Sequence, residues 1–159
     1  WAVLAAGALA ASAADSWATE LGTLKGGVPR SIATLRPLPA GLSGGISAMG
    51  TAAAFAGALF VALAAYSLGW SRAMAVGVFA GGVVGALADS LIGATLQDRR
   101  RCDACEAWTE RMVHSCGMET RHASGLEWLD NDWVNVLCTL IGAATAAVAA
   151  ALLAAPVPR

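Results

Sequence analysis

The sequence predicts an all-α protein: a polytopic bundle of about four membrane-spanning helices with a small zinc-ribbon-like loop at one end. Hydrophobic residues make up 57% of the 159 residues and charged residues only 13%, whereas a soluble domain carries about 25% charged residues. Four apolar segments reach, or nearly reach, the roughly 20 residues that a spanning helix needs. Two polar loops separate these segments, and one of the loops contains a Cys-x₂-Cys pair.

The four apolar segments are rich in Ala and Gly. They cover Trp1 to about Leu24, about Ile46 to Leu68, about Ala73 to Leu96, and about Val134 to Ala155, where Pro156 and Pro158 stop the helix. The first segment begins in mid-run, so we expect residues 1–159 to be one membrane domain whose N-terminal helices are missing. It has no basic n-region and no cleavage site after it, which argues against a signal peptide. The alternative, a soluble domain of buried helices, is disfavoured because four such runs leave too little polar surface to cover them.

The basic residues predict the orientation in the membrane. Loop A runs from about Lys25 to Gly45 and loop B from about Asp98 to Trp133, and two helices separate them, so both lie on one side. These loops hold eight of the ten basic residues, and only Arg72 and Arg159 lie on the other side. Positive loops stay in the cytoplasm, so we expect loops 25–45 and 98–133 to be cytoplasmic in a multi-pass protein of a bacterial plasma membrane. The Pro and Gly content of loop A argues against regular structure.

Two stripes of small residues mark the helix faces that pack against neighbours. One stripe holds Gly77, Gly81, Gly85, Asp89 and Gly93, and the other holds Gly7, Ala11, Asp15 and Thr19. Residues four apart share one helix face, and small residues there let helices approach closely. The stripes are those of ordinary helix contacts, but such contacts do not explain an aspartate on each. Asp15 and Asp89 are therefore predicted to face the interior of the bundle.

Ionisable residues inside a span are candidates for function. Asp15 and Asp89 each lie ten residues before a basic residue of a loop, which places them at similar depth. Glu20 lies nearer the surface, and "WLDNDWVN" adds Asp130, Asn131 and Asp132 at the start of the last helix. Such carboxylates repel one another unless a cation neutralises them, and hard oxygen ligands suit Mg²⁺. The alternatives are helix N-capping for Asp130 or Asp132 and a structural hydrogen bond for Asp15 or Asp89.

Loop A also carries a candidate phosphate site. The stretch "PAGLSGGIS" brings Ser43, Gly44 and Gly45 before a helix N-terminus, where free backbone N–H groups suit phosphate oxygens. Arg30 and Arg36 are expected to pair with phosphate. Basic groups with Mg²⁺ are the usual way to hold a transferring phosphoryl group. Because a flexible loop can have the same composition, this stretch predicts a phosphate site only in combination with the carboxylates.

Loop B carries a candidate metal site. Cys102 and Cys105 form the Cys-x₂-Cys pair, and Cys116 with either His114 or His122 completes a tetrahedral set. This spacing is typical of structural zinc, and a disulfide is not expected on a cytoplasmic loop. Reduced free thiols and redox chemistry remain alternatives. Cys138 lies inside the last helix and is interpreted as a packing residue.

Several of these motifs together resemble the DUF92, or TMEM19-like, family of integral membrane proteins. The resemblance rests on "ADSWATELG", "PAGLSGGIS", "ADSLIGATLQ", the cysteine loop and "LDNDWVN", and it covers nearly the whole chain as the C-terminal portion of a member. It implies an activity like that of phytyl-phosphate kinase, which the family includes. More distantly, "DSWATELG" is similar to an element of lipid-linked enzymes that use CTP, and "LDND" is similar to an Asp-Asn element of dolichol kinases. The resemblance implies that Asp15, with Asp130 or Asn131, faces the nucleotide or metal.

Three functional readings follow. The first is a kinase that transfers a phosphoryl group from CTP, or another nucleoside triphosphate, to a phytyl or polyprenyl monophosphate whose tail lies in the bilayer. In it Asp15, Asp89 and Asp132 hold Mg²⁺. The second is an ion- or proton-coupled transporter that uses Asp15 and Asp89, which needs a polar path to the opposite face. The third is a structural membrane protein whose zinc loop binds a partner. Net charge −1 without a basic patch argues against nucleic acid as a partner.

Overall fold

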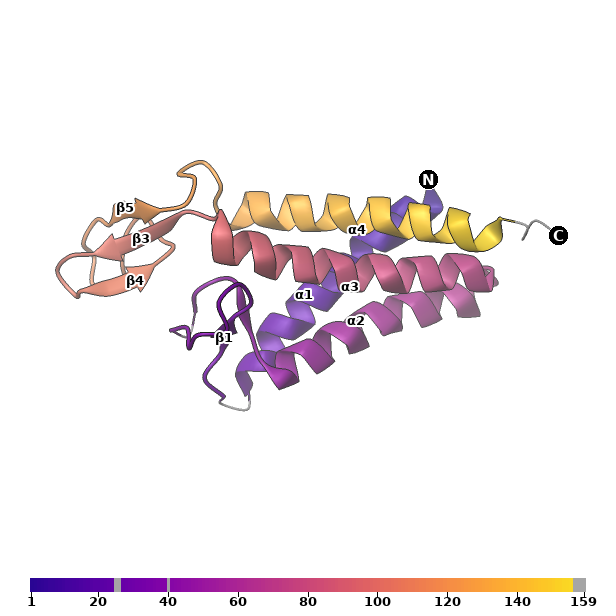
Figure 1. Cartoon of the computed structure of the whole chain (residues 1–159), viewed down its shortest axis with the longest axis horizontal. Helices are drawn as coiled ribbons and strands as arrows, with labels where there is room; N and C mark the ends of the chain where they lie inside the picture. The colour runs from indigo at the N-terminus through magenta and orange to yellow at the C-terminus, as the bar shows by residue number, and fades with distance from the viewer. Residues whose placement is uncertain (25–26, 40, 156–159) are drawn as a thin grey trace.

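The chain folds into four long helices with a small β-structure at one end, as the computed structural model in Figure 1 shows. Residues 1–24, 27–39 and 41–155 are described by the structure. The helices are α1 (Ala2–Leu24), α2 (Ala48–Ser67), α3 (Arg72–Thr95) and α4 (Asn131–Ala154). In Figure 1, α3 and α4 run side by side in opposite directions, while α1 crosses the bundle obliquely. Lys25, Pro156, Pro158 and Arg159, on which parts of the topology prediction rest, lie outside the described residues.

The predicted fold class is confirmed. Within the described residues, α2, α3 and α4 are long and apolar enough to cross a membrane. The fourth expected span is α1, which is 23 residues long but is not among these three. Its C-terminal half carries Asp15, Thr19 and Glu20, and polar residues of this kind lower the hydropathy of a helix.

The distribution of side-chain sizes is the reverse of that in a soluble protein. The fully buried residues of the helix interfaces are small, such as Ala10, Ala11, Ala58 and Ala146. Large apolar side chains point outward, and α2 alone exposes Phe55, Leu59, Phe60 and Leu63. A soluble fold buries its large apolar residues, whereas helices in a bilayer pack through small residues and turn large ones to the lipid. This pattern rules out the soluble alternative.

Gly and Ala allow the helix backbones to touch. A Cβ atom on Gly57 would lie 2.8 Å from the carbonyl oxygen of Ala13, and one on Gly85 would lie 3.0 Å from that of Cys138. Gly7 likewise approaches Gly142 and Ala146. Both predicted small-residue stripes are thus the contact faces of α1 and α3, and the backbones meet there at distances that leave no room for a larger side chain.

Local hydrogen bonds set the helix ends. Ser47 and Ser71 cap α2 and α3, and the Asp130 carboxylate caps α4 by accepting the N–H groups of Asp132 and Trp133, both at 3.1 Å. Because Asp130 is the cap, α4 begins at Asn131 rather than at Val134, where the hydropathy alone predicted its start. The polar residues after the cap form the first turn of the helix.

The two loops lie at the same end of the bundle, as their sequence positions predicted (Figure 1). Loop A is more regular than expected: β1 (Arg30–Ser31) pairs in antiparallel fashion with β2 (Gly45–Ile46). This pairing closes the loop into a compact turn, with Leu38 buried beneath it. The expectation of irregular structure was therefore wrong for its two ends, where backbone hydrogen bonds outweigh the Pro and Gly content.

Loop B forms a three-stranded antiparallel sheet, here called the ribbon (residues 99–124). Its strands are β3 (Arg99–Cys102), β4 (Ala107–Thr109) and β5 (Arg121–Ser124), in the order β4-β3-β5. Two backbone hydrogen bonds of 2.9 Å beside the ribbon join the ends of α3 and α4: the N–H of Leu126 donates to the carbonyl of Leu96, and the N–H of Asp98 donates to that of Leu129. A zinc-ribbon-like element at one end of a helix bundle is thus confirmed as architecture.

Candidate functional site

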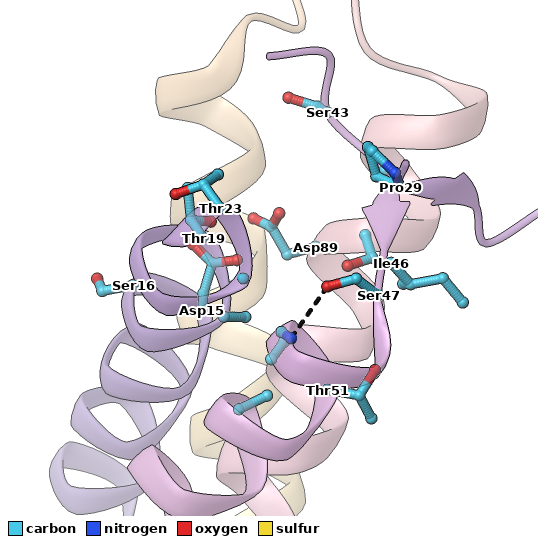
Figure 2. A pocket seen from close by; sticks show the side chains of 18 of the residues that line it. Asp15, Ser16, Thr19, Thr23, Pro29, Ser43, Ile46, Ser47, Thr51 and Asp89 are labelled. Carbon is cyan, nitrogen blue, oxygen red and sulfur yellow. Dashed lines mark hydrogen bonds between the residues drawn. The ribbon is translucent and has the colours of Figure 1, made fainter. Parts of the chain in front are cut away.

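Asp15 of α1 and Asp89 of α3 meet inside the bundle. Their carboxyl groups point toward one another in Figure 2, and the two side chains are close enough to affect each other's charge. The meeting follows from the packing of the two stripes, because Ala11 on α1 contacts Gly85 on α3 one turn earlier on each helix. Two carboxylates this close repel one another unless a proton or a cation lies between them. The pair is therefore a place where a positive charge is stabilised.

The Asp15–Asp89 pair borders a cavity of about 590 Å³, a size typical of sites for small ligands. Hydroxyl groups gather at its polar end: Figure 2 shows Thr19 and Thr23 on the α1 side of the pair and Ser43 and Ser47 across from them. The wall that runs down the bundle is apolar and consists of Ala54, Phe55, Val83, Ala86 and Leu87. One cavity thus combines a polar head region with an apolar channel between α2 and α3.

Of the eleven residues predicted for the carboxylate and phosphate site, seven line this cavity and four do not. The residues that line it are Asp15, Glu20, Ser43, Gly44, Gly45, Asp89 and Asn131. Asp130, Asp132, Arg30 and Arg36 are not among its lining residues. Asp130 is occupied as the cap of α4, Asp132 is exposed, and Arg30 donates a hydrogen bond of 2.9 Å to the carbonyl of Leu35 within its own loop. The N-capping alternative therefore accounts for Asp130.

Glu110 is a cavity residue that the sequence analysis missed. Its carboxylate accepts hydrogen bonds from the backbone N–H of Ser43 at 2.6 Å, from the Ser43 hydroxyl at 2.8 Å, and from the Gln97 amide at 2.9 Å. The Ser43 N–H, predicted to be free for phosphate, is therefore already bonded. Ser43 and Glu110 lie 67 residues apart, so no local pattern pointed to this contact.

The cation that bonds Ser43 also differs from the predicted ones. The Arg99 guanidinium donates to the carbonyl of Ser43 at 3.2 Å and to that of Gly93 at 3.5 Å. Arg99 lies shortly after the end of α3, as the first residue of β3. Its side chain reaches back to the end of α3 and to loop A. Asn135, one turn beyond Asn131, also lines the cavity and was not predicted; its spacing of four from Asn131 was a usable signal.

The cysteine motif of the ribbon forms a compact cluster. One ligand atom from each of Cys102, Cys105, His114 and Cys116 lies within 4.8 Å of all the others. The Sγ atoms of Cys102 and Cys116 are 3.6 Å apart, and Nδ1 of His114 lies 3.2 Å from Sγ of Cys116. Cys102 is fully buried. All four cysteines of the chain are free thiols, and Cys138 is buried in α4 away from the cluster.

Hydrogen bonding within the cluster separates the acidities of its thiols. The bond with His114, supported by the backbone N–H of Met118, lowers the pKa of Cys116 to about 6. The bond between Cys105 and Cys116 raises the pKa of Cys105 to about 11. Cys116 is therefore the sulfur that carries negative charge first, and the thiolate is the form that binds metals.

The second histidine of the loop has another partner. Nδ1 of His122 lies 2.7 Å from the Asp98 carboxylate, which also pairs with Arg100 at 3.0 Å. Of the two histidines left open by the spacing, His114 is thus the one in the cluster. His122 instead ties β5 to the residue that precedes β3.

Comparisons with known proteins agree with the membrane architecture. A family model described as "Integral membrane protein DUF92" matches residues 1–143. Protein PGR of Arabidopsis thaliana is 31% identical over 139 residues, which cover 80% of this chain and 47% of that protein. An uncharacterised membrane protein of Methanocaldococcus jannaschii is 37% identical over 56% of this chain and 37% of its own length, and one of Synechocystis is 32% identical over 83% and 42%. The chain thus spans less than half the length of these relatives. No solved structure matches it.

Proposed function

The chain belongs to the DUF92 family of integral membrane proteins, and we propose that it is a phosphotransferase acting on a lipid phosphate. It moves a phosphoryl group from CTP, or another nucleoside triphosphate, to a phytyl or polyprenyl monophosphate at the predicted cytoplasmic face. The observation that carries the proposal is the shape of the cavity. A carboxylate pair and a set of hydroxyl groups lie at its polar end, and an apolar wall leads from them into the bundle.

The apolar wall suits the hydrocarbon tail of the acceptor. Phe55 on α2 and Leu87 on α3 line the cavity, and each side chain is nearly half exposed. Apolar, partly exposed side chains of this kind suit contact with a hydrocarbon chain. A prenyl chain lying between α2 and α3 would therefore place its phosphate at the polar end.

The polar end suits a divalent cation and a nucleotide. Asp15 and Asp89 offer the hard oxygen ligands that Mg²⁺ prefers, and Asn131 and Asn135 offer amide oxygens in the same cavity. The ion would neutralise the phosphates of the donor and the charge that develops during transfer. Asp132, which the sequence also assigned to the cation, is not among the lining residues.

The transfer itself needs no general base from the protein. An oxygen of the acceptor monophosphate is already anionic and attacks the γ-phosphorus of the donor. A new P–O–P bond forms while the bond to the β–γ bridging oxygen breaks, and its electron pair leaves with the nucleoside diphosphate. The chain has to hold two anions, the acceptor monophosphate and the nucleoside triphosphate, side by side. Its contribution is therefore to position them and to stabilise their charge.

The structure favours this activity over the transporter reading. Transport along Asp15 and Asp89 requires a path to the opposite end of the bundle. Toward that end the helices touch through small residues: Gly7 meets Ala146, and Gly77 meets Ala150. Such backbone contacts close the interior toward that end, whereas the cavity is lined by residues near the loop end of the bundle, among them Glu20, Ser43 and Glu110.

A direct assay tests the proposal. The purified protein in lipid nanodiscs is incubated with phytyl or geranylgeranyl monophosphate, Mg²⁺ and each nucleoside triphosphate, and the diphosphate product is measured. Asp15→Asn and Asp89→Asn should each lower the rate by about 100-fold or more, the usual cost of losing an electrostatic contact in the transition state. Asp103→Asn, an exposed aspartate of the ribbon, is the matched control. Absence of product with every pair, or full activity in both cavity variants, would refute the proposal.

A further inference from the structure

Two separations within the cysteine cluster are close to those of a tetrahedral metal site. For zinc with Zn–S of about 2.3 Å and Zn–N of about 2.0 Å, tetrahedral angles place two sulfurs about 3.8 Å apart and a sulfur and a nitrogen about 3.5 Å apart. The observed separations are 3.6 Å between Cys102 and Cys116 and 3.2 Å between His114 and Cys116. Three thiolates and one imidazole form a donor set that zinc prefers.

The four ligands come from three separate segments of the ribbon. Cys102 ends β3, Cys105 lies in the turn before β4, and His114 and Cys116 lie in the long connection to β5. The strands are only three or four residues long. A metal that binds all four ligands crosslinks this connection to β3, and in small domains such binding supplies much of the folding free energy.

Glu110 connects this crosslinked ribbon to the cavity. It directly follows β4, whose residue Thr109 pairs with Arg100 of β3, and its carboxylate receives both the N–H and the hydroxyl of Ser43. Arg99, the first residue of β3, holds the carbonyl of the same Ser43. The ribbon thus fixes the Ser43 backbone from both sides. Ser43 belongs to the glycine-rich loop (residues 41–46), which borders the cavity.

We propose that Cys102, Cys105, His114 and Cys116 bind one zinc ion, and that the zinc-bound ribbon holds the glycine-rich loop over the cavity through Glu110. Glu110 is in this role a positioning residue: it acts on Ser43 and through it on the shape of the cavity. The metal site lies outside the cavity and does not take part in chemistry there. The inference does not depend on the proposed phosphoryl transfer, and neither of its tests measures that reaction.

The metal is tested by elemental analysis of the purified protein. About one zinc per chain is expected, with most of it lost in Cys102→Ser and Cys105→Ser and all of it kept in Cys138→Ser, the matched control in α4. Since the first two variants risk misfolding, the folded wild type is also treated with a chelator and then given zinc again; release and rebinding are expected. Protein without zinc, iron in its place, or equal zinc in the Cys102 and Cys138 variants would overturn the assignment.

The connection is tested by hydrogen–deuterium exchange of peptides that cover residues 41–46. Glu110→Gln should raise exchange at the Ser43 amide about tenfold or more, since the uncharged amide accepts more weakly and has one acceptor oxygen in place of two, while zinc is retained. Glu127→Gln, an exposed glutamate before α4, should leave exchange unchanged. Chelation of the wild type should raise exchange in the same peptides, and chelation of Glu110→Gln should add little. Unchanged exchange in the chelated wild type, or in Glu110→Gln, would overturn the connection.

Discussion

Gly44 and Gly41 offer a matched pair for measuring how closely loop A approaches α3. Both have a backbone conformation that favours glycine, with φ of +81° and +88°. A Cβ atom on Gly41 would meet nothing within 4 Å, whereas one on Gly44 would overlap the backbone of Ala94 near the end of α3. Gly41→Ala therefore introduces backbone strain alone, and Gly44→Ala introduces the same strain together with a steric clash.

The two components have different magnitudes. Forcing an L-residue into the left-handed region costs roughly 1–2 kcal/mol, which we expect for Gly41→Ala. Overpacking costs about 1–3 kcal/mol more, and the backbone of Ala94 cannot rotate away as a side chain can. Relief comes from moving Ser43 off α3, which also breaks its bonds to Glu110 and Arg99.

Hydrogen exchange of residues 41–46 measures the difference. Exchange in Gly44→Ala should exceed that in Gly41→Ala by a factor of about 5 to 150, the ratio that 1–3 kcal/mol corresponds to. The thermal stability of the helix bundle should change little in either variant, because the loop lies outside the helix interfaces. Equal exchange in the two variants would show that loop A does not rest on α3 as described.

Three further predictions follow from contacts described above. Gly85→Val should destabilise the bundle by about 1–3 kcal/mol, because Gly85 touches Ala11 and Cys138; Val84→Leu on the exposed side of α3 should not, and equal thermal melting of the two would contradict the packing. His114→Ala should lose zinc while His122→Ala retains it, because His122 bonds Asp98; elemental analysis decides, and the reverse order would reassign the ligand. Asp130→Ala should destabilise α4 by about 1 kcal/mol through loss of the N-cap, whereas Asp132→Ala should have little effect; if exchange at the start of α4 rose only in Asp132→Ala, the capping assignment would be wrong.

The meeting of Asp15 and Asp89 could be predicted from sequence because it depends on regular helix geometry. Each aspartate extends a stripe of residues spaced by four, and both lie at similar depth. When two helices pack through such stripes, residues at the same depth on the two helices come into contact. The same regularity explains why the helix ends were predicted to within three residues.

The contacts of the loops could not be predicted in this way. The choice of His114 over His122 depends on the register of β5 against β3. The Ser43–Glu110 bond depends on the position of the ribbon relative to loop A. Neither leaves a periodic signal in the sequence. Arg30 and Arg36 were expected at the phosphate site because they are close in sequence to Ser43, yet Arg99 reaches it from the end of α3.

Two backbone hydrogen bonds beside the ribbon tie the ends of α3 and α4 to each other. Leu96 and Asp98 after α3 are bonded to Leu126 and Leu129 before α4, so these helix ends can separate only if both bonds break. Asp89 on α3 and Asn131 on α4, which both line the cavity, are therefore carried by helices whose ends are joined. A motion that moved loop A away from the cavity would have to break the bonds of Ser43 to both Glu110 and Arg99.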